Sequence, residues 1–374
     1  MRYYIIAGEA SGDLHGSNLI KEIKKIDTIA TIRCWGGDLM QQTGADLVMH
    51  YRDLAFMGFL EVIKNLGTIM KNLRFCKDDI ILFKPDALIL IDYPGFNLRI
   101  AEWAKKNAIK VIYYISPQVW AWKESRVKSI KESVNKMLVI LPFEKEFYQK
   151  WNYEVEYVGH PLIEVVENAK SDASRVPPSS DSPLNENNII AILPGSRRQE
   201  VEKKLPVMLE VSKFFPDYHF IVAKAASLVD PFYEELMQAF PKVRSVRNNT
   251  YALLMQSKAA LVTSGTATLE TALFGIPQVV CYKGSNISYQ IARRLVKIKY
   301  ISLVNLIMDK PVVKELIQHN LTVENLHLEL KRLLYTPSIH QAMKEDYTEL
   351  WNLLIEGGRA SAKAARSIVD FLKH

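Results

Sequence analysis

The sequence predicts an α/β protein built from two doubly wound parallel-sheet domains. Short apolar runs alternate with amphipathic stretches along most of the 374 residues, and a polar segment divides the chain near its middle. The apolar runs lack the alternation of apolar and polar residues that half-buried strands show, so they are typical of strands buried on both faces. Alternation of such strands with helices produces parallel sheets that are covered by helices on both sides.

Eight apolar runs rich in isoleucine, valine, leucine and aromatic residues are the predicted strands. An amphipathic helix is predicted over 98–106, after the second of them. The predicted strands span residues 3–7, 87–91, 111–115 and 137–141 in the first half of the chain, and 189–193, 218–222, 259–263 and 278–282 in the second.

The segment 169–188, AKSDASRVPPSSDSPLNENN, is rich in proline and serine and almost free of large apolar residues. This composition is typical of an interdomain linker. It predicts an N-terminal domain over 1–168 and a C-terminal domain over 189–349. Two such domains favour a ligand cleft between the carboxyl edges of their sheets.

Composition narrows the class of function. The net charge of +7 suits phosphorylated substrates or an anionic membrane surface but is modest for a nucleic-acid binder, so no nucleic-acid partner is expected. The three cysteines form no C-x-x-C pair, which favours a reducing compartment over a disulfide scaffold or a zinc site. No H-E-x-x-H motif and no D-x-D triplet occurs, so no metal is expected. We expect no other cofactor. We also expect no signal peptide and no membrane span.

The stretch IIAGEASGDLHG at 5–16 places glycines after a predicted strand, as phosphate-binding loops do. Each glycine is four residues from the next, which does not match the G-x-G-x-x-G of dinucleotide folds, and no lysine completes a Walker A loop. Glu9 in this turn also disfavours a bare anion. A nicotinamide-dependent dehydrogenase is therefore the least favoured class.

The stretch IIAILPGSRRQEV at 189–201 is a strand, a turn and the start of a helix. Free backbone N–H groups at a helix start, together with an adjacent guanidinium, can bind a diphosphate without a metal. Arg197 lies in the turn itself and is the better candidate of the two arginines. In the alternative interpretation, Gly195 and Ser196 only cap the helix and both arginines are solvated.

A second such loop, ALVTSGTATLETALFGIP, spans 260–277. Its small residues Ser264, Gly265 and Thr266 leave the backbone open to a bulky anionic group. A capping box would pair a hydroxyl N-cap with Glu270 at a distance of three residues, but the residue at that distance is Ala267. Glu270 is therefore a candidate acceptor for the two hydroxyls of a ribose.

Eight stretches together resemble the signature blocks of the lipid-A-disaccharide synthase family, in that family's order and over most of the chain. The resemblance implies a GT-B glycosyltransferase fold, in which the C-terminal domain binds the UDP part of a donor and the N-terminal domain faces the acceptor. It also suggests that a last helix, within about 350–374, returns to the N-terminal domain. The stretches are AGEASGDLHG, IDYPGFN, SPQVWAWKESR, LPFEKEFY, YVGHPL, LPGSRRQEV, TSGTATLE and LVNLIMDKPVVKELIQ.

The resemblance implies a specific reaction. It would join UDP-2,3-diacylglucosamine to 2,3-diacylglucosamine 1-phosphate, form a β-1,6 disaccharide with inversion, and release UDP. The implied donor site comprises Gly195, Ser196, Arg197, Ser264, Gly265, Thr266, Glu270 and Asn305. The chain departs from the family's pattern at Met308 and Asp309, where relatives tend to carry a glycine or alanine and a basic residue.

Such a displacement needs a base for the attacking hydroxyl. Asp92 ends a buried strand before a Pro-Gly turn, and the resemblance implies that it is this base. An aspartate of ordinary pKa is ionised at neutral pH, so no tuning of its pKa is expected. Glu9 is the second candidate, as an alternative base or a ligand of the acceptor. The simpler interpretations are an N-cap for Asp92 and a helix-dipole partner for Glu9.

The stretch 56–75 carries apolar residues at 59, 63, 66, 70 and 73, a helical stripe with basic residues elsewhere. This pattern is typical of an interfacial helix and also of an ordinary core helix. Our hypothesis is that Phe59, Leu66 and Met70 contact the inner face of the cytoplasmic membrane. Basic residues at Lys123, Arg126, Lys128 and Lys131 form a second candidate contact with lipid phosphates.

Two other classes share these nucleotide loops. A UDP-sugar 2-epimerase has the same architecture but needs no lipid acceptor. A non-catalytic nucleotide-sugar binding protein would not depend on Asp92.

Overall fold

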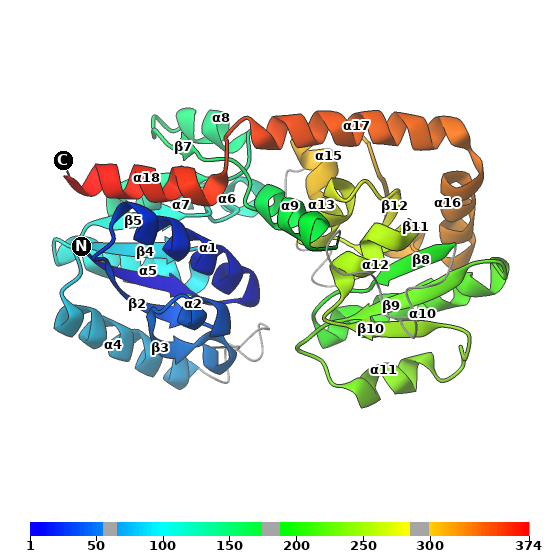
Figure 1. Ribbon diagram of the computed structural model, residues 1–374, viewed down its shortest axis with the longest axis horizontal. Coiled ribbons are helices and arrows are strands. Elements are labelled where there is room, and N and C mark those ends of the chain that lie inside the picture. Colours follow the sequence, from blue (N-terminus) through cyan, green and yellow to red (C-terminus); the bar gives the residue numbers. More distant parts are fainter. Residues whose placement is uncertain (55–65, 174–187, 285–298, 374) are drawn as a thin grey trace. The chain divides into compact units, whose positions relative to one another are not determined.

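The computed structural model describes residues 1–54, 66–173, 188–284 and 299–373, and the chain folds into two compact units (Figure 1). Unit 1 comprises Met1–Pro161 and Leu354–His374, and unit 2 comprises Leu162–Leu353. The first helix of unit 2, α9 (Leu162–Ala173), continues past residue 169, where the sequence predicted the linker to begin. The residues at this point are compatible with a helix, and the rest of the predicted linker up to 187 lies outside the described residues.

Unit 1 contains a seven-stranded sheet in the order β3-β2-β1-β4-β5-β6-β7, in which the paired strands are parallel. The strands are β1 (Arg2–Ala7), β2 (Thr31–Gly36), β3 (Asp46–His50), β4 (Ala87–Ile91), β5 (Val111–Tyr114), β6 (Lys136–Val139) and β7 (Glu156–Tyr157). The helices are α1 (Ala10–Ile26), α2 (Asp38–Gln42), α4 (Leu66–Phe83), α5 (Pro94–Lys106), α6 (Val119–Trp122), α7 (Arg126–Ser133), α8 (Glu144–Gln149) and α18 (Ala360–Lys373), with a 3-10 turn η1 (Tyr51–Leu54).

Helices cover both faces of this sheet. Successive residues of a strand point to opposite faces, so each buried strand contributes apolar side chains to two cores. Tyr4 and Ile6 of β1 pack into the core that α4, α5 and α7 close. Tyr3 and Ile5 pack into the other core, which α1 and α18 close. The C-terminal helix α18 thus lies beside α1 (Figure 1).

Unit 2 contains a six-stranded sheet in the order β10-β9-β8-β11-β12-β13, again with parallel pairs. The strands are β8 (Ile189–Leu193), β9 (His219–Lys224), β10 (Arg244–Arg247), β11 (Ser257–Thr263), β12 (Gln278–Tyr282) and β13 (Lys314–Ile317). The helices after α9 are α10 (Arg198–Val211), α11 (Asp230–Met237), α12 (Thr250–Gln256), α13 (Thr266–Leu273), α15 (Leu303–Met308), α16 (Val323–Tyr335) and α17 (Pro337–Ile355), with 3-10 turns η2 (Ser212–Phe214) and η3 (Gln318–Asn320).

The strand order places a crevice in each sheet. In unit 1 the chain direction across the sheet reverses between β1 and β4, and in unit 2 it reverses between β8 and β11. Loops that leave the carboxyl ends of two such strands diverge, so this point is where open α/β sheets bind ligands. The glycine-rich stretch after β1 and Asp92 after β4 share the first of these points, and the two predicted donor loops share the second.

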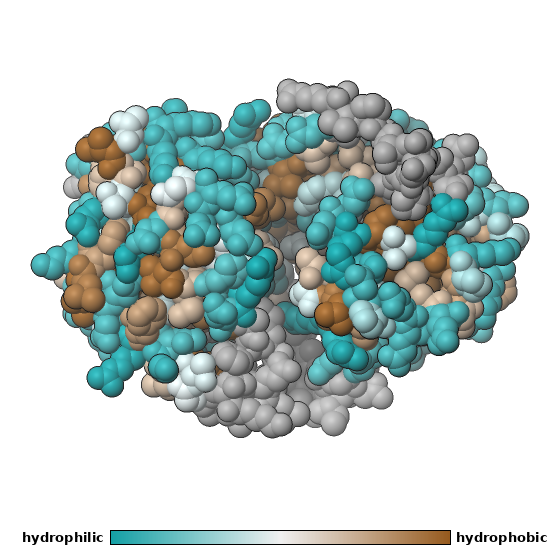
Figure 2. Space-filling model, turned by 60° about the horizontal axis from the view of Figure 1, so that its bottom comes forward, coloured by the Kyte–Doolittle hydropathy of each residue, from teal (hydrophilic) through white to brown (hydrophobic). Residues whose placement is uncertain are grey.

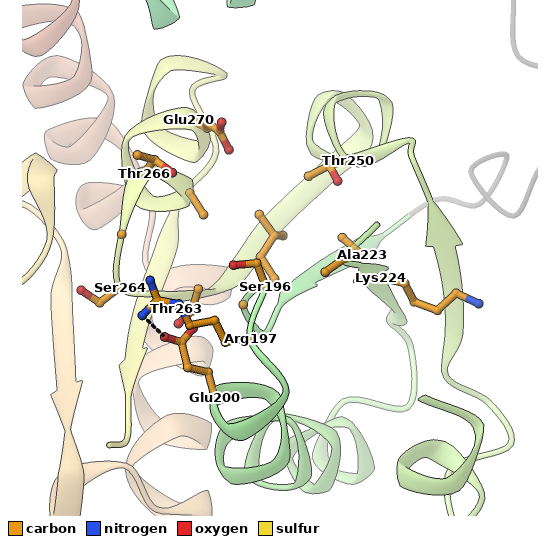
Figure 3. Close-up of a pocket in the computed structure, with 15 residues that line it drawn as sticks. Ser196, Arg197, Glu200, Ala223, Lys224, Thr250, Thr263, Ser264, Thr266 and Glu270 are labelled. Atoms are coloured by element: carbon orange, nitrogen blue, oxygen red, sulfur yellow. Dashed lines mark ion pairs between the residues drawn. The ribbon is translucent and has the colours of Figure 1, made fainter. Parts of the chain in front are cut away.

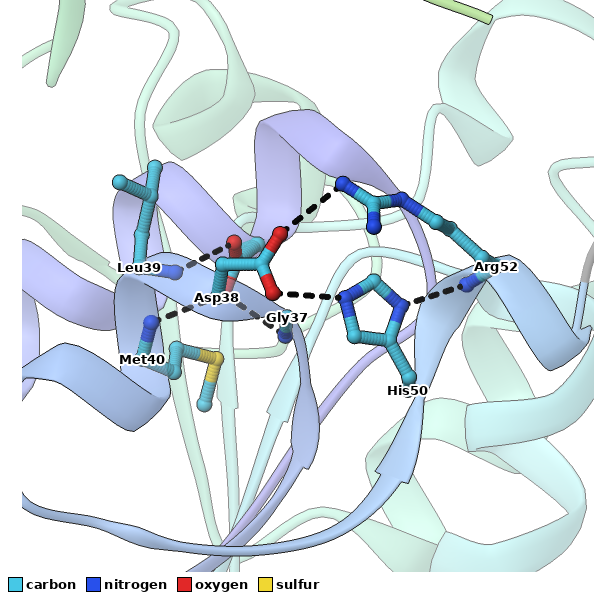
Figure 4. Close-up of polar contacts among 7 residues, drawn as sticks. Gly37, Asp38, Leu39, Met40, His50 and Arg52 are labelled. Atoms are coloured by element: carbon cyan, nitrogen blue, oxygen red, sulfur yellow. Dashed lines mark hydrogen bonds and ion pairs between the residues drawn. The ribbon is translucent and has the colours of Figure 1, made fainter.

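A polar cluster fixes the loops beside β1 at the carboxyl edge of the unit 1 sheet. Asp13 of α1 accepts N–H groups of Gly37, Leu39 and Met40 at 2.8, 3.1 and 3.0 Å, and so caps α2 from a neighbouring helix. Asp38 in turn lies 2.9 Å from Arg52 and 3.5 Å from His50 (Figure 4). These contacts tie α2 to α1 and to the end of β3, and so hold the helix that begins next to Glu9.

Within the described ranges, no helix combines the length and the apolar character that a membrane crossing requires.

Candidate active site

The turn after β8 forms the first side of the site. Gly195 has a φ of +118°, which favours glycine, and a Cβ there would lie 2.9 Å from Oε2 of Glu200. Helix α10 begins at Arg198, and Arg197 at its N-cap makes no capping hydrogen bond. The structure therefore does not support the alternative in which Ser196 caps this helix. The first N–H groups of α10 point toward the positive end of its dipole, where an anion is favoured.

The loop after β11 forms the second side. Gly265 has a φ of +138°, and among the described residues other than its chain neighbours no atom lies within 4 Å of the position that a Cβ would take there. The Ser264 hydroxyl donates to the carbonyl oxygen of Ile301 at 2.8 Å, and the Thr268 hydroxyl donates to that of Gly265 at 2.8 Å. These bonds hold the loop open, with bare backbone at Gly265.

The two loops border one cavity of about 400 Å³ in unit 2 (Figure 3). This volume lies within the usual range for small-molecule sites. Its walls include residues of both predicted donor loops, namely Gly195, Ser196, Arg197, Ser264, Gly265, Thr266 and Glu270.

Glu270 contributes a carboxylate from the first turns of α13. Its side chain accepts a hydrogen bond from the Tyr251 hydroxyl at 3.3 Å. Burial raises the pKa of Glu270 above its ordinary value, and the bond from Tyr251 partly opposes this. The carboxylate lines the cavity and keeps acceptor capacity for a second donor.

Several residues of the cavity wall were missed from the sequence. Thr250 begins α12, Thr263 ends β11, and Lys224 ends β9, where it pairs with Asp230. Glu200 lies in the first turn of α10 and reaches back to the Gly195 turn. Only the position of these residues at strand ends or in a first helical turn could have indicated them.

Asn305 is not part of this cavity. Its amide Nδ2 donates to Val313 O at 2.9 Å and to Glu315 Oε1 at 3.0 Å, and its Oδ1 accepts Val313 N–H at 2.9 Å. Asn305 is 1% exposed, and its amide joins α15 to the strand β13. In the structure the Asn305 amide thus serves packing, and its assignment to the donor site stays a prediction. Asp309 is one of the two positions at which the chain departs from the family pattern. It ends α15 with a φ of +46°, a conformation that glycine usually adopts at the end of a helix.

The second group of candidate residues lies at the carboxyl edge of the unit 1 sheet. Asp92 follows β4 with a φ of +44°, and Tyr93 has a φ of +49°. The Asp92 carbonyl oxygen accepts two hydrogen bonds, from the Tyr113 hydroxyl at 2.6 Å and from the Asn97 amide at 2.8 Å. These bonds stabilise the strained turn. The N-cap of the next helix, α5, is Tyr93, so Asp92 does not cap it.

The Asp92 carboxyl is half-buried, and its pKa differs from the ordinary value that the sequence predicted. Burial, together with the charge of Glu9, raises the pKa of Asp92 to about 7. The two carboxyl groups are therefore close enough to repel each other. Glu9 is the N-cap residue of α1 and makes no side-chain capping bond there.

Other titratable groups at the carboxyl edge of this sheet are buried. Burial lowers the pKa of His15 to about 4 and that of His160 to about 3, so both are neutral at physiological pH. Glu144, after β6, accepts the N–H groups of Leu141 and Ile140 at 3.0 and 3.3 Å, and burial raises its pKa to about 7. Glu144 is a third carboxyl that sequence reasoning missed, although it lies in the quoted stretch LPFEKEFY.

The positions of the apolar stripe over 56–75 that the structure describes are divided between core and surface. Phe59 lies outside the described residues, and Leu66 begins α4. Met70 is 63% exposed, whereas Leu73 is buried in the core. Figure 2 shows separate brown patches on the face that carries α4, among teal residues. Among the described side chains of α4, Phe75, Ile81 and Leu82 are also large, apolar and exposed.

Comparison with known proteins identifies a family to which this chain is similar along nearly its whole length. Residues 3–369 match the family model described as lipid-A-disaccharide synthetase. The lipid-A-disaccharide synthase of Syntrophus aciditrophicus (strain SB) is 39% identical over 371 residues, which cover 97% of this chain and 96% of that protein. The enzyme of the same name from Geobacter metallireducens is 37% identical over 376 residues, which cover 99% and 97%.

Two solved structures share the fold at low sequence identity. UDP-GlcNAc 2-epimerase from Neisseria meningitidis, bound to UDP-GlcNAc, aligns over 100% of both chains with a TM-score of 0.68 and 14% identity. The glycotransferase of kitacinnamycin aligns over 99% of this chain and 98% of its own, with a TM-score of 0.64 and 13% identity. The chain belongs to the lipid-A-disaccharide synthase family and is a glycosyltransferase of lipid A biosynthesis with two parallel-sheet domains of the GT-B type.

Proposed function

We propose that this enzyme joins UDP-2,3-diacylglucosamine to 2,3-diacylglucosamine 1-phosphate, forms a β-1,6 disaccharide with inversion at the donor carbon, and releases UDP. The observation that carries the proposal is the cavity at the strand-order reversal of unit 2. It combines an uncapped helix N-terminus, a guanidinium and a carboxylate, which match the diphosphate and the ribose of a nucleotide sugar.

The diphosphate of the donor would bind at the start of α10. There the first N–H groups of the helix and the Arg197 guanidinium can both donate to phosphate oxygens. In the transition state the leaving UDP gains negative charge, and donors fixed in advance stabilise that charge without having to reorganise. Glu270 would accept the ribose hydroxyls, and the open backbone at Gly265 would allow close approach of the nucleotide.

Asp92 would take the proton of the attacking acceptor hydroxyl. A pKa of about 7 suits a general base at neutral pH, because the group is substantially ionised and still binds a proton readily. Burial and, after it, the charge of Glu9 keep this pKa raised, and Glu9 is the neighbouring group that could bind an acceptor hydroxyl. In the alternative assignment Glu9 is the base. The pH dependence of kcat/KM in the single variants Asp92→Asn and Glu9→Gln distinguishes the two assignments.

We also propose that the enzyme works at the inner face of the cytoplasmic membrane, where it would meet acylated substrates. The exposed Met70 on α4 and the basic residues Lys123, Lys128 and Lys131 support this, since apolar and cationic groups together favour an anionic lipid surface.

The decisive experiment follows UDP release from UDP-diacylglucosamine with and without the acceptor lipid. The transferase proposal expects release only when the monosaccharide lipid is added, with one disaccharide formed per UDP. The similarity of fold to UDP-GlcNAc 2-epimerases makes an epimerase the second candidate. An epimerase would change the configuration of the donor sugar with no acceptor present, and this result would overturn the proposal.

A further inference from the structure

A lysine is buried beneath the turn that forms one side of the cavity. Lys204, on α10, is 2% exposed. Its ammonium donates to Oγ1 of Thr263 and lies 3.7 Å from Oε2 of Glu200. The other oxygen of Glu200 lies 3.8 Å from Arg197, and Figure 3 marks this ion pair.

The cost of burying an ammonium indicates that this arrangement has a role. A charged group removed from water is strongly destabilising unless opposite charges and hydrogen-bond partners surround it. Lys204 has both, in Glu200 one helical turn earlier and Thr263 on β11. Gly195 makes the arrangement feasible, because a Cβ at that position would lie 2.9 Å from the Glu200 carboxylate and 3.6 Å from the Lys204 nitrogen.

Glu200 creates an electrostatic problem for an anion at this turn. Its carboxylate lines the cavity, so a diphosphate bound at the start of α10 would meet a like charge. Glu200 also competes for Arg197, the guanidinium that the diphosphate would use. Together, the side chains of Arg197, Glu200 and Lys204 carry a net charge of +1. Without Lys204, the remaining pair carries no net charge.

Lys204 itself is not among the residues that line the cavity, whereas Glu200 and Thr263 both are. We propose that Lys204 is a positioning residue for donor binding: its buried ammonium neutralises Glu200 and holds it beneath the Gly195 turn, which leaves Arg197 and the backbone amides to a diphosphate. This inference rests on the proposed binding of a nucleotide diphosphate in this cavity.

Calorimetric titration of the full chain with UDP tests the inference. Lys204→Met keeps the length of the side chain and removes its charge, and we expect UDP to bind about tenfold or more weakly. Lys203→Met is the matched control, because Lys203 is the neighbouring exposed lysine and the same charge is lost. Its affinity for UDP should stay within about twofold of the unmodified protein.

The double variant Lys204→Met/Glu200→Gln separates an indirect role from a direct contact. If Lys204 acts by neutralising Glu200, removal of both charges restores UDP affinity to within about threefold of the unmodified protein. A double variant that binds as weakly as Lys204→Met overturns the inference, and so does a Lys204→Met variant that binds UDP normally. An unmodified protein that does not bind UDP at all contradicts the proposed function instead.

Folding of each variant is checked by circular dichroism and thermal unfolding. If Lys204→Met does not fold, the single variant Glu200→Gln tests the inference, because it removes the carboxylate charge and leaves the lysine in place. We expect this variant to bind UDP at least as tightly as the unmodified protein. A loss of about tenfold or more would mean that Glu200 serves the ligand directly, and would overturn the inference.

Discussion

The ring of Tyr93 occupies the space in which a side chain at Gly8 would lie: a Cβ on Gly8 would stand 2.3 Å from the ring atoms Cγ and Cδ1. The two residues follow β1 and β4, which pair in the sheet with Ala7 opposite Ile91. Contact between them brings the two loops together and places Glu9 near Asp92. Burial raises the pKa of Asp92, and the charge of Glu9, which this packing brings near, raises it further.

Gly8→Ala should disrupt the proposed base without affecting the donor site. The new methyl group must displace the Tyr93 ring, and with it the left-handed turn that positions Asp92. We expect turnover to fall by about 100-fold, as for other small displacements of catalytic groups, with UDP affinity unchanged. Gly67→Ala on α4 is the control, because no described residue outside its own helix backbone and chain neighbours comes within 4 Å of its Cβ position. Equal turnover of the two variants would contradict this account.

Asp92→Asn should remove the base and its pH dependence. Only the ionised carboxylate can accept the proton, so kcat/KM of the unmodified enzyme is expected to rise with pH through about 7 and then level off. In Asp92→Asn we expect a loss of about 10²–10⁴-fold and no remaining titration near pH 7. If the titration persists in this variant and disappears in Glu9→Gln, Glu9 is the base.

The same substitution should stabilise the fold at neutral and higher pH. Since the pKa of Asp92 is raised on folding, the native state binds the proton more tightly than the unfolded state, and stability is lost as pH rises from about 4 to about 7. Asparagine resembles the protonated form at every pH. The Tm of Asp92→Asn should therefore exceed that of the unmodified protein at pH 8, and the difference should vanish near pH 4. A constant difference across this range would indicate that the carboxyl does not titrate as described.

The fold was predictable where strands are buried on both faces. All eight predicted strands are strands in the structure, within two residues of the predicted bounds. The strands that were missed are those with charged or exposed residues. The strands β3, β7, β10 and β13 lie at or next to sheet edges, and β2 carries Arg33, whose guanidinium pairs with Asp46 and Asp79. Such strands lack the continuous apolar pattern that indicates burial.

Only those parts of the site that are formed by one continuous stretch of sequence could be predicted. The turns at Gly195 and Gly265 follow strands directly, so the sequence alone indicates them. Asn305 bonds to Val313 and Glu315, eight and ten residues further along the chain. Burial, together with the charge of Glu9 from another loop, raises the pKa of Asp92. No local pattern carries this information, because the partners are brought together by the sheet.

Arg197 and Arg198 should differ sharply despite their similar exposure of 62% and 60%. Arg197 lines the cavity, whereas Arg198 pairs with Glu202 and lies 4.6 Å over the Phe232 ring. Arg197→Met should weaken UDP binding by about 10- to 100-fold, the usual loss for a charge-assisted bond to phosphate. Arg198→Met should change it by less than about twofold. Titration calorimetry at two salt concentrations measures both, and equal effects would point to general charge rather than a diphosphate contact.

The membrane hypothesis can be tested on vesicles that contain anionic lipid. Serine at Phe59, Leu66 and Met70 removes apolar area, and Met70 at least contributes little to the core because it is 63% exposed. We expect the triple variant to stay folded and to remain in the supernatant when the vesicles are sedimented, since interfacial binding scales with buried apolar area. Phe214→Ser in unit 2, at another exposed apolar position, is the control and should still sediment. Unchanged sedimentation of the triple variant would end the hypothesis for this segment and leave Lys123 and the basic residues of α7 as the remaining contact.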